Sequence, residues 1–375
     1  MNAKPVVYHL GKFPPKDIDW SRLIPLIGPA SAGLARYDGL LSAIPNAHIL
    51  LSPLKMQEAV LSSKIEGTHV TMGEVLEIEA GAESDKITQP KRDEAEEVTN
   101  YRKAMRACIR EMEHRSLSQQ VLKSAHGLLM QGVRGRNKSP GSFRHEQNWI
   151  GPKGCKIEEA RFVPVAPEHL QSEMDAWERY LTSKAEPDAL VQLAIVHVEF
   201  EALHPFMDGN GRLGRMLIPL FLFQHSLLAS PDFYMSGYLE AHREEYQERL
   251  RAVSSEGDWT GWCAFFLTGV RQQAAENERK ARAILALYNR VKAYAVELTH
   301  SQHSIRAVDF IFQNPIFMAP HFTRQSRIPK PTAARILMLL RKNELLRTLQ
   351  KGKGRRPGIY AFKELLNIAE GKEVF

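Results

Sequence analysis

The chain contains 375 residues, of which 43% are hydrophobic and 25% charged, and its formal net charge is +7. These values predict an ordinary soluble protein with room for two or three domains. We expect neither a signal peptide nor a membrane span, because no apolar run approaches the ~20 residues that cross a bilayer. Cys108, Cys155 and Cys263 are odd in number and scattered, so they imply neither a disulfide framework nor a zinc site, and a reduced cytoplasm fits best.

The first part of the chain reads mainly as helix. Residues 1–50 predict an irregular segment with a helix near Ser31–Ala43. A helix over 53–67 is indicated by Ser52, an N-cap serine followed by proline, and by Gly67 as the C-terminal stop. Further amphipathic helices are predicted at 91–113, 118–132 and 167–183.

Two short segments predict a β-hairpin within this helical chain. Residues 147–150 and 161–163 have the composition of strands, and Gly-Pro-Lys-Gly at 151–154 is typical of a turn. An isolated hairpin is only marginally stable. We therefore expect these strands to pack against the rest of the protein.

The most informative stretch runs from His204 to Arg215 and reads HPFMDGNGRLGR. An apolar run, Leu190–Leu203, precedes it, and apolar residues at three-and-four spacing follow it, so the pattern predicts helix, tight loop, helix. Its glycines also fit the dinucleotide pattern G-x-G-x-x-G. That pattern belongs between a strand and a helix, and this context argues against a Rossmann fold.

The residue types in this loop suit a polyphosphate. Asp208 can share a Mg²⁺ with phosphate oxygens, and backbone N–H groups ahead of a helix can bind those oxygens. Arg212 and Arg215 can neutralise the remaining charge. His204 stands one helical turn from Asp208, where it can deprotonate an attacking hydroxyl.

The helices around the motif carry fewer chemical signals. His197 is expected to be a hydrogen-bonded interior histidine, because no acidic residue or cysteine has ligand spacing to it. Residues 238–246 predict a helix. Asp258–Trp262 predicts the start of another that ends near Val270, and residues 271–298 read as a charged connecting helix.

The positive charge gathers at the C-terminal end. Residues 324–356 contain eleven Lys or Arg and one acid, Glu344, a local charge of +10, so the remainder of the chain sums to −3. Three helices (305–312, 320–326, 332–342) and two strands (345–350, 358–362) are predicted here. Their order resembles a winged helix-turn-helix with 332–342 as recognition helix. DNA binding, protein binding and dimerisation all stay open. The residues that would contact DNA phosphates are Arg335, Arg341, Lys351, Lys353, Arg355 and Arg356.

The core motif resembles that of the Fic family, H-P-F-x-[DE]-G-N-G-R-x-x-R, and meets every fixed position. The resemblance covers roughly residues 50–270 and implies a mainly α fold, a helical bundle with a β-hairpin flap at 145–165. It implies that His204 is the catalytic base and that Asp208 binds Mg²⁺. The implied nucleotide-binding residues are Glu66, His204, Gly209, Asn210, Gly211, Arg212, Leu213, Gly214, Arg215 and Tyr246.

Ser62 and Glu66 lie four residues apart and share a face at the end of helix 53–67. Composition alone favours a solvated last turn capped by Gly67. However, Ser62-x-x-x-Glu66-Gly67 is similar to the Fic inhibitory motif [ST]-x-x-x-E-[GN]. In that family the glutamate pairs with the second arginine of the core motif, here Arg215, and keeps the γ-phosphate of ATP out of the productive pose.

In Fic proteins the free edge of the flap takes up a target segment by strand addition. Phe143 and Arg144 also match the sequence that usually precedes the flap in this family. The alternative interpretation is a hairpin that only covers the core. The residues implied in target docking are Gln147, Asn148, Trp149, Ile150, Phe162 and Val163.

The implied activity is transfer of AMP from ATP, with Mg²⁺, to a Ser, Thr or Tyr hydroxyl of a target protein, which includes the chain itself. Three alternatives are a kinase-like or phosphocholine-transferring relative, a nucleotide-sensing DNA-binding regulator, and a Rossmann oxidoreductase. His204, Asp208 and Arg215 argue against pure sensing, because sensing needs no base.

These patterns together predict four parts. They are an N-terminal helical region (1–110) with the inhibitory helix, a catalytic core (111–270), a connecting helix (271–300) and a winged-helix-like domain (301–375). A homodimer is the default expectation for a soluble protein.

Overall fold

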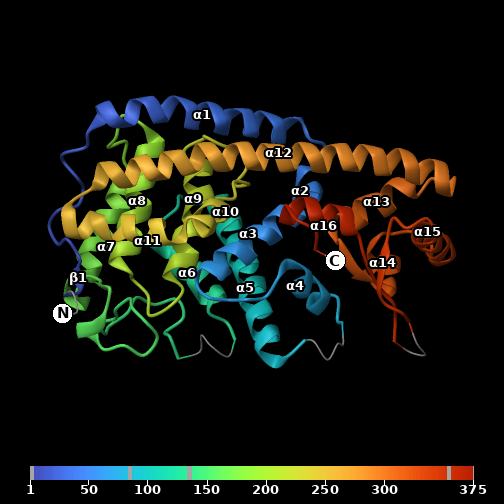
Figure 1. Cartoon of the computed structure of the whole chain (residues 1–375), viewed down its shortest axis with the longest axis horizontal. Coiled ribbons are helices and arrows are strands. Elements are labelled where there is room, and N and C mark those ends of the chain that lie inside the picture. Colours follow the sequence, from blue (N-terminus) through green and yellow to red (C-terminus); the bar gives the residue numbers. More distant parts are fainter. Residues whose placement is uncertain (1–3, 83–86, 133–136, 353–355, 375) are drawn as a thin grey trace. The chain divides into compact units, whose positions relative to one another are not determined.

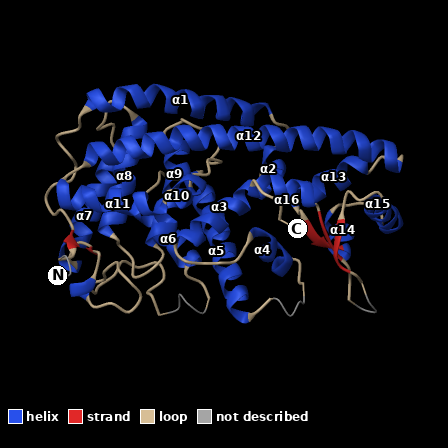
Figure 2. Cartoon of the chain, viewed as in Figure 1, coloured by secondary structure: helices blue, strands red, loops and turns tan. Residues whose placement is uncertain are grey.

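The computed structural model describes residues 4–82, 87–132, 137–352 and 356–374 (Figure 1). Helices dominate these residues and strands are few (Figure 2). The contacts divide the chain into two compact units: residues 1–38, 61–67 and 99–275 form the first, and residues 39–60, 68–98 and 276–375 form the second. Within the described ranges, no helix combines the length and apolar character needed to cross a membrane.

The elements up to the core motif are β1 (Val6–Val7), α1 (Trp20–Ala43), α2 (Ala47–Leu50), α3 (Ser52–Ile65), α4 (Met72–Glu79), α5 (Gln89–Met112), α6 (Gln119–Leu129), η1 (Ile157–Glu159), β2 (Phe162–Val163), α7 (Pro167–Thr182) and α8 (Ala189–Leu203). The elements after it are α9 (Asn210–Gln224), α10 (Ser236–Ala241), α11 (Arg243–Glu256), α12 (Trp259–Thr299), α13 (Ser304–Gln313), β3 (Ile316–Met318), α14 (Ala319–Gln325), α15 (Lys330–Lys342), β4 (Arg347–Gln350), β5 (Ile359–Ala361) and α16 (Lys363–Glu370).

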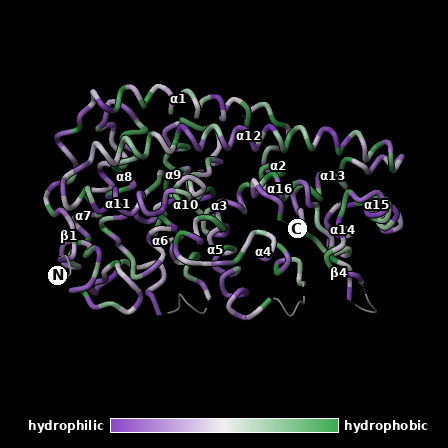
Figure 3. The backbone as a smooth tube through the Cα atoms, viewed as in Figure 1, coloured by the Kyte–Doolittle hydropathy of each residue, from purple (hydrophilic) through white to green (hydrophobic). Residues whose placement is uncertain are grey.

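Helix α8 is the centre of the first unit. Asp188 caps its start, since one carboxylate oxygen accepts from the backbone N–H groups of Leu190 and Val191 at 2.9 and 3.1 Å. Every residue from Leu190 to Leu203 is buried, so the helix needs neighbours on all sides. Helices α7 and α9 pack against it, and Figure 3 colours these segments by the hydropathy of their residues.

The predicted helix, loop, helix arrangement of the core motif is confirmed. Helix α8 ends at Leu203 and α9 begins at Asn210, so a helix and not a strand precedes the glycines. The Rossmann alternative is therefore excluded. Two residues of the loop have left-handed backbones, His204 with φ 48° and Gly209 with φ 80°. Gly209 tolerates this conformation because it has no Cβ.

The N-terminal segment is more regular than predicted. Strand β1 pairs in parallel with β2, with Val6 opposite Phe162 and Val7 opposite Val163. Helix α1 begins at Trp20, well before the predicted start at Ser31. Two prolines inside α1 made this region read as irregular.

The predicted two-stranded hairpin is wrong in detail. Only one antiparallel bridge joins its arms, between Ile150 and Phe162, and the segment between them contains the turn η1. The other edge of β2 pairs with β1, so the second ladder partner comes from the N-terminal segment. Pairing this remote cannot be read from local composition.

The helices after α9 also differ from the prediction. The helix predicted over residues 238–246 is interrupted at His242, which separates α10 from α11. Asp258 does cap the next helix, as its carboxylate accepts from the N–H of Gly261 at 2.8 Å. That helix, α12, then continues to Thr299, so the two helices predicted to meet near Val270 are one.

The second unit contains the C-terminal elements. Strands β3, β5 and β4 form an antiparallel sheet in that order, with Ile316 opposite Ala361 and Thr348 opposite Tyr360. Helices α13, α14 and α15 pack on one another, and α14 contacts β3. The three helices and two strands predicted here are present, and β3 and α16 are additions that the sequence did not indicate.

Candidate active site

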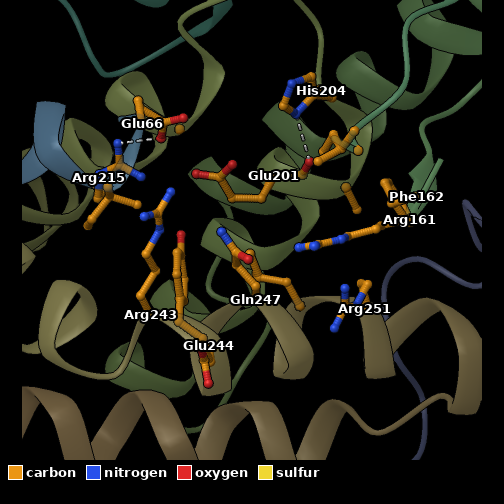
Figure 4. A pocket seen from close by; sticks show the side chains of 17 residues that line it. Glu66, Arg161, Phe162, Glu201, His204, Arg215, Arg243, Glu244, Gln247 and Arg251 are labelled. Carbon is orange, nitrogen blue, oxygen red and sulfur yellow. Dashed lines mark hydrogen bonds and ion pairs between the residues drawn. The ribbon is translucent and has the colours of Figure 1, made fainter. Parts of the chain in front are cut away.

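A cavity of about 510 Å³ opens in the first unit beside the loop that joins α8 to α9 (Figure 4). The end of α3, the last turn of α8, the start of α9, one face of α11 and residues 150–151 and 161–162 form its walls. Glu66 and Arg215 lie on one side of the cavity, and Arg161 and Phe162 on the other (Figure 4).

The loop before α9 is held by its own side chains. Asn210 accepts from the N–H of Phe206 and donates to its carbonyl, both at 2.8 Å, which closes the turn. Asn210 is the first residue of α9, so its backbone N–H has no intrahelical acceptor and can donate to a ligand at the helix N-terminus. A side chain at Gly211 would meet Glu66, because a Cβ there would lie 2.2 Å from Oε1.

His204 faces the cavity from the end of α8. Its Nδ1 lies 3.3 Å from the carbonyl of Glu201, which only accepts, so Nδ1 carries the proton and Nε2 keeps a lone pair. Burial lowers the pKa of His204 to about 4. The imidazole is therefore neutral at physiological pH, which is the form that a general base requires.

Two residues whose structural role the sequence did not indicate hold this loop in place. Arg144 donates from Nε to the carbonyl of His204 at 3.0 Å and from another nitrogen to Leu203 at 3.3 Å, and it stabilises the C-terminus of α8. His126 accepts from the N–H of Gly141 at 2.8 Å and so donates from Nε2 to the carbonyl of Asp208 at 3.0 Å. Nothing in the residue types alone distinguishes His126 from an ordinary core histidine.

Arg215 meets the end of α3, as the resemblance implied. One guanidinium nitrogen donates to Glu66 Oε1 at 2.6 Å and to the carbonyl of Ser62 at 2.8 Å, and Nε donates to Ser62 Oγ at 2.9 Å. Arg215 is 1% exposed, whereas Glu66 is 40% exposed because it borders the cavity. Burial raises the pKa of Glu66, but the charge of Arg215 outweighs it and the pKa is lowered overall. Glu66 is thus ionised and paired.

Asp208 has the free oxygen that a metal ion would need. Its Oδ1 accepts from the N–H of Gly209 at 2.6 Å and lies 3.6 Å from Arg212, whereas Oδ2 has no hydrogen-bond partner among the described residues. The side chain is 46% exposed. The described ranges contain no group of three or more His, Cys, Asp or Glu that suits a metal. One carboxylate with phosphate oxygens is, however, a usual Mg²⁺ environment, so these residues fit the ion.

Glu201 is a second carboxyl group in the cavity and was not predicted. It is 9% exposed, and its Oε1 has no hydrogen-bond partner among the residues that the structure describes. Burial raises the pKa of Glu201 to about 7, against the lowering effect of Arg215 and with a further raising effect from Glu66. The charge of Glu201 therefore changes near physiological pH.

Some of the predicted nucleotide-binding residues line the cavity and others do not. Glu66, His204, Gly211, Arg215 and Tyr246 line the cavity. Leu213 is fully buried in α9 and the carbonyl of Gly214 accepts from His197, and neither residue belongs to the cavity lining. His197 is hydrogen-bonded in the interior, as predicted.

Some of the residues predicted to dock a target are exposed, and others are turned into the protein. Trp149 and Ile150 are 42% and 39% exposed. Gln147 and Asn148 instead turn inward, where Gln147 donates to the carbonyl of Pro164 at 3.1 Å and Asn148 to that of Phe206 at 3.0 Å. Phe162 is buried against the cavity and Val163 pairs with β1.

Two stretches match models of one family. Residues 24–110 match the Fic/DOC family N-terminal model, and residues 116–222 match the Fic/DOC family model. The chain is also 30% identical over 118 residues to a Fido domain-containing protein of Dictyostelium discoideum, which covers 30% of this chain and 71% of that protein.

Relatives with a stated activity match over a shorter part of their length. A probable protein adenylyltransferase of Aquifex aeolicus is 32% identical over 117 residues, or 29% of this chain and 37% of that protein. This chain therefore spans little more than a third of that relative. A solved Fic family protein from Desulfovibrio desulfuricans has a TM-score of 0.59 at 20% identity and covers 93% of this chain and 98% of that one. The likeness confirms the predicted helical fold class.

Proposed function

This chain belongs to the Fic/DOC family, and on that premise we propose that it is a protein adenylyltransferase that transfers AMP from ATP to a hydroxyl of a target protein. The observation that carries the proposal is the lone pair of His204 Nε2 at a cavity that also holds the N-terminus of α9 and Arg215. A base, an anion-binding helix start and a cation are what phosphoryl chemistry of this kind requires.

The chemical step follows from this arrangement. The oxygen of a Ser, Thr or Tyr hydroxyl forms a bond to the α-phosphorus, and the bond from that phosphorus to the α,β-bridging oxygen breaks. Pyrophosphate leaves, and His204 Nε2 takes the hydroxyl proton. The N–H groups at the start of α9 bind phosphate oxygens, and Arg212 and Arg215 offset their charge. Mg²⁺, held by Asp208 and the phosphates, would supply further charge neutralisation.

The contact between Glu66 and Arg215 supports autoinhibition. Arg215 makes its shortest hydrogen bond to Glu66, so the guanidinium is occupied by a carboxylate from the chain itself. A terminal phosphate of ATP is negatively charged like the Glu66 carboxylate, and it would accept hydrogen bonds from the same guanidinium. We infer that Glu66 competes with that phosphate and has to leave before ATP binds in its productive pose.

The edge available for a target segment is the one at Trp149 and Gly151. The N–H groups of Val6 and Tyr8 donate to the carbonyls of Arg161 and Val163, which occupies the outer edge of β2. Phe162 faces Ile150 on the inner edge. The backbone of residues 149 and 151 points the other way, so we propose that a target adds there and that Trp149 and Ile150 contact it.

Label transfer tests the proposed activity. Purified wild type, E66G and H204A would be incubated with Mg²⁺ and ATP labelled on the α-phosphate, and in parallel on the γ-phosphate. Protein labelled from the α-phosphate alone, most strongly in E66G, supports adenylylation. Label from the γ-phosphate alone would make the protein a kinase-like relative. No label in any variant, with the protein itself and a cell extract as targets, would contradict the proposal.

A second function is proposed for the C-terminal elements. The order α13, β3, α14, α15, β4, β5 with an antiparallel sheet resembles that of a winged helix, and this resemblance supports the proposal of DNA binding through α15. Arg335 donates to the carbonyl of Thr299 at 2.8 Å and Arg341 lies 4.8 Å over the ring of Tyr360, so both are engaged within the unit. Lys353 and Arg355 lie outside the described residues.

Fluorescence anisotropy with a labelled DNA duplex tests this second function. Binding by the full chain that weakens steeply between 50 and 200 mM salt, as phosphate contacts do, supports it. Absence of binding at low salt would assign these elements to protein contacts. Light scattering on the same samples would test the proposed homodimer, and the cytoplasmic location remains a prediction from the cysteine pattern.

A further inference from the structure

A buried carboxylate on α8 is bound by side chains from the start of the chain. Glu199 is fully buried, and the hydroxyl of Tyr8 donates to its Oε1 at 2.6 Å. His9 Nε2 donates to its Oε2 at 2.9 Å, since a carboxylate can only accept. Within the described ranges, these two side chains are the hydrogen-bond partners of Glu199. Without the N-terminal segment, an interior carboxylate would therefore lack donors, which is costly.

The same two residues are anchored on other helices. His9 Nδ1 lies 2.7 Å from Oγ of Ser254 on α11, and its ring meets that of Trp259, the first residue of α12, edge-on with centroids 5.1 Å apart. The hydroxyl of Tyr8 also lies 3.1 Å from Glu173 on α7. Burial raises the pKa of the Tyr8 hydroxyl well above its usual value, so it stays protonated and remains a donor.

This segment is also paired with the flap. Strand β1 directly precedes Tyr8 and pairs with β2. The backbone N–H of Val6 donates to the carbonyl of Arg161 at 3.3 Å, and that of Tyr8 donates to the carbonyl of Val163 at 3.0 Å. Strands this short are only marginally stable by themselves. The buried contacts of Tyr8 and His9 therefore hold β1 in place, and β1 holds β2.

Strand β2 lies between this segment and the cavity. Arg161 and Phe162 form part of the cavity wall (Figure 4). Phe162 is bridged to Ile150, which belongs to the edge proposed for target docking. Glu199 lies near the end of α8, the helix that His204 directly follows. The N-terminal segment thus connects the docking edge to the helix that positions the base.

We propose that residues 6–9 form a clamp that keeps the flap in register with His204, with His9 and Glu199 as positioning residues for the target hydroxyl. The inference rests on the proposed function, in which a target adds to the flap at Trp149 and Ile150. The groups proposed to bind phosphate lie on α9, whereas the clamp contacts α7, α8, α11, α12 and β2. Loosening the clamp should therefore impair delivery of the target and leave ATP binding intact.

Hydrogen exchange of the flap is the first measurement, because it requires no activity. V6P removes the N–H that bonds to Arg161, whereas V7P changes the neighbouring N–H, which points away from β2 in an edge strand. We expect V6P to speed the exchange of the Ile150 and Phe162 amides, which bond across the flap at 2.9 and 3.1 Å. The increase should be about fivefold, the scale of one backbone hydrogen bond, and V7P should show none.

Substitution of His9 tests the anchor itself. The amide of H9Q can still donate to Glu199, whereas H9L cannot. Exchange of the flap amides should rank wild type, then H9Q, then H9L, with H9L roughly tenfold faster than wild type. If H9L speeds exchange throughout the protein, it is unfolded and the comparison of V6P with V7P decides. Equal flap exchange in V6P and V7P would overturn the clamp.

The role in target delivery is measured in the E66G background. Label transfer from α-phosphate-labelled ATP to proteins of a cell extract should fall about fivefold in E66G/V6P and stay unchanged in E66G/V7P. ATP affinity, measured by calorimetry, should be the same in all three proteins. Faster flap exchange with unchanged labelling would overturn the positioning role. A parallel loss of ATP affinity would also overturn it, because the clamp would then serve the nucleotide site.

These outcomes are separable from the proposed activity. If V6P loosens the flap but E66G transfers no label, the transferase function fails and the attachment of the flap by residues 6–9 stands. If E66G transfers label but V6P neither loosens the flap nor lowers labelling, the clamp fails and the transferase function stands.

Discussion

Arg215 on α9 donates a hydrogen bond of 2.6 Å to Glu66, which follows the last turn of α3. Removing that carboxylate leaves the guanidinium free to bind a phosphate. We therefore expect E66G to increase α-phosphate label transfer at least tenfold over wild type, since a charged hydrogen bond contributes about 1.5–3 kcal/mol. The measurement is the initial rate of labelling at saturating Mg²⁺.

A substitution that keeps size but removes charge is the control for this effect. E66Q retains a hydrogen-bonding side chain next to Arg215 without the ion pair, so its rate should fall between wild type and E66G. If all three rates agree in an assay that detects H204A as inactive, residues 62–67 are only a helix end.

His204 supplies the second prediction. H204A removes the only lone pair assigned to the attacking hydroxyl, and a general base contributes about 10²–10⁴ in rate. In the E66G background, H204A should lower kcat by at least two orders of magnitude and leave ATP affinity within a factor of a few. Substantial residual transfer would remove His204 as the base. A large loss of ATP affinity would instead make it a binding residue.

The sequence predicted the core motif well because its signals are local. The glycines, the apolar helix before them and the spacing after them lie within one stretch, so the loop between α8 and α9 followed directly. Contacts between distant residues were different. The pairing of Glu66 with Arg215 was expected from a family resemblance alone, because nothing in the composition of α3 selects that partner.

The residues whose roles escaped prediction share one property. His126, Arg144 and Glu201 act on backbone carbonyls or within the cavity, and as residue types they read as ordinary helix or loop positions. Strands β1 and β2 have two residues each, too short for a period-two pattern, and lie far apart in the chain. Helix α12 contains Gly269 directly before Val270, but the helix continues through this glycine to Thr299, because a single glycine inside an otherwise helical pattern is tolerated.

Glu201 makes stability depend on pH in a direction opposite to that of most carboxyl groups. Burial raises its pKa from 4.5 to about 7, so between these values the folded state binds more protons than the unfolded state. Stability is then lost as pH rises, by up to about 3 kcal/mol from this group alone. E201Q has no proton to lose. We expect it to melt several degrees above wild type at pH 8, with a smaller difference at pH 5.

The groups that face Glu201 are Arg215 and Glu66, with Tyr246 on α11. Because all three keep their charge states between pH 5 and 8, the change in the melting difference reports Glu201. The same melting difference at pH 5 and pH 8 would mean that Glu201 is ionised throughout. Melting curves in matched buffers at the two pH values, followed by circular dichroism, decide between these outcomes.

Arg144 is 2% exposed, and its guanidinium donates to four carbonyls, those of Glu146, Val165, Leu203 and His204. R144M leaves several of these buried acceptors unpaired, so we expect a loss of roughly 3–5 kcal/mol in unfolding free energy by urea denaturation. R144K should recover little, since one ammonium cannot reach four acceptors held by a planar fork. In the E66G background kcat should fall about tenfold, because the carbonyl of His204 would be displaced.

The exposed Arg179 is the control for this substitution, and R179M should change neither the unfolding free energy nor kcat. A fully active and stable R144M would show that the loop keeps its shape without Arg144.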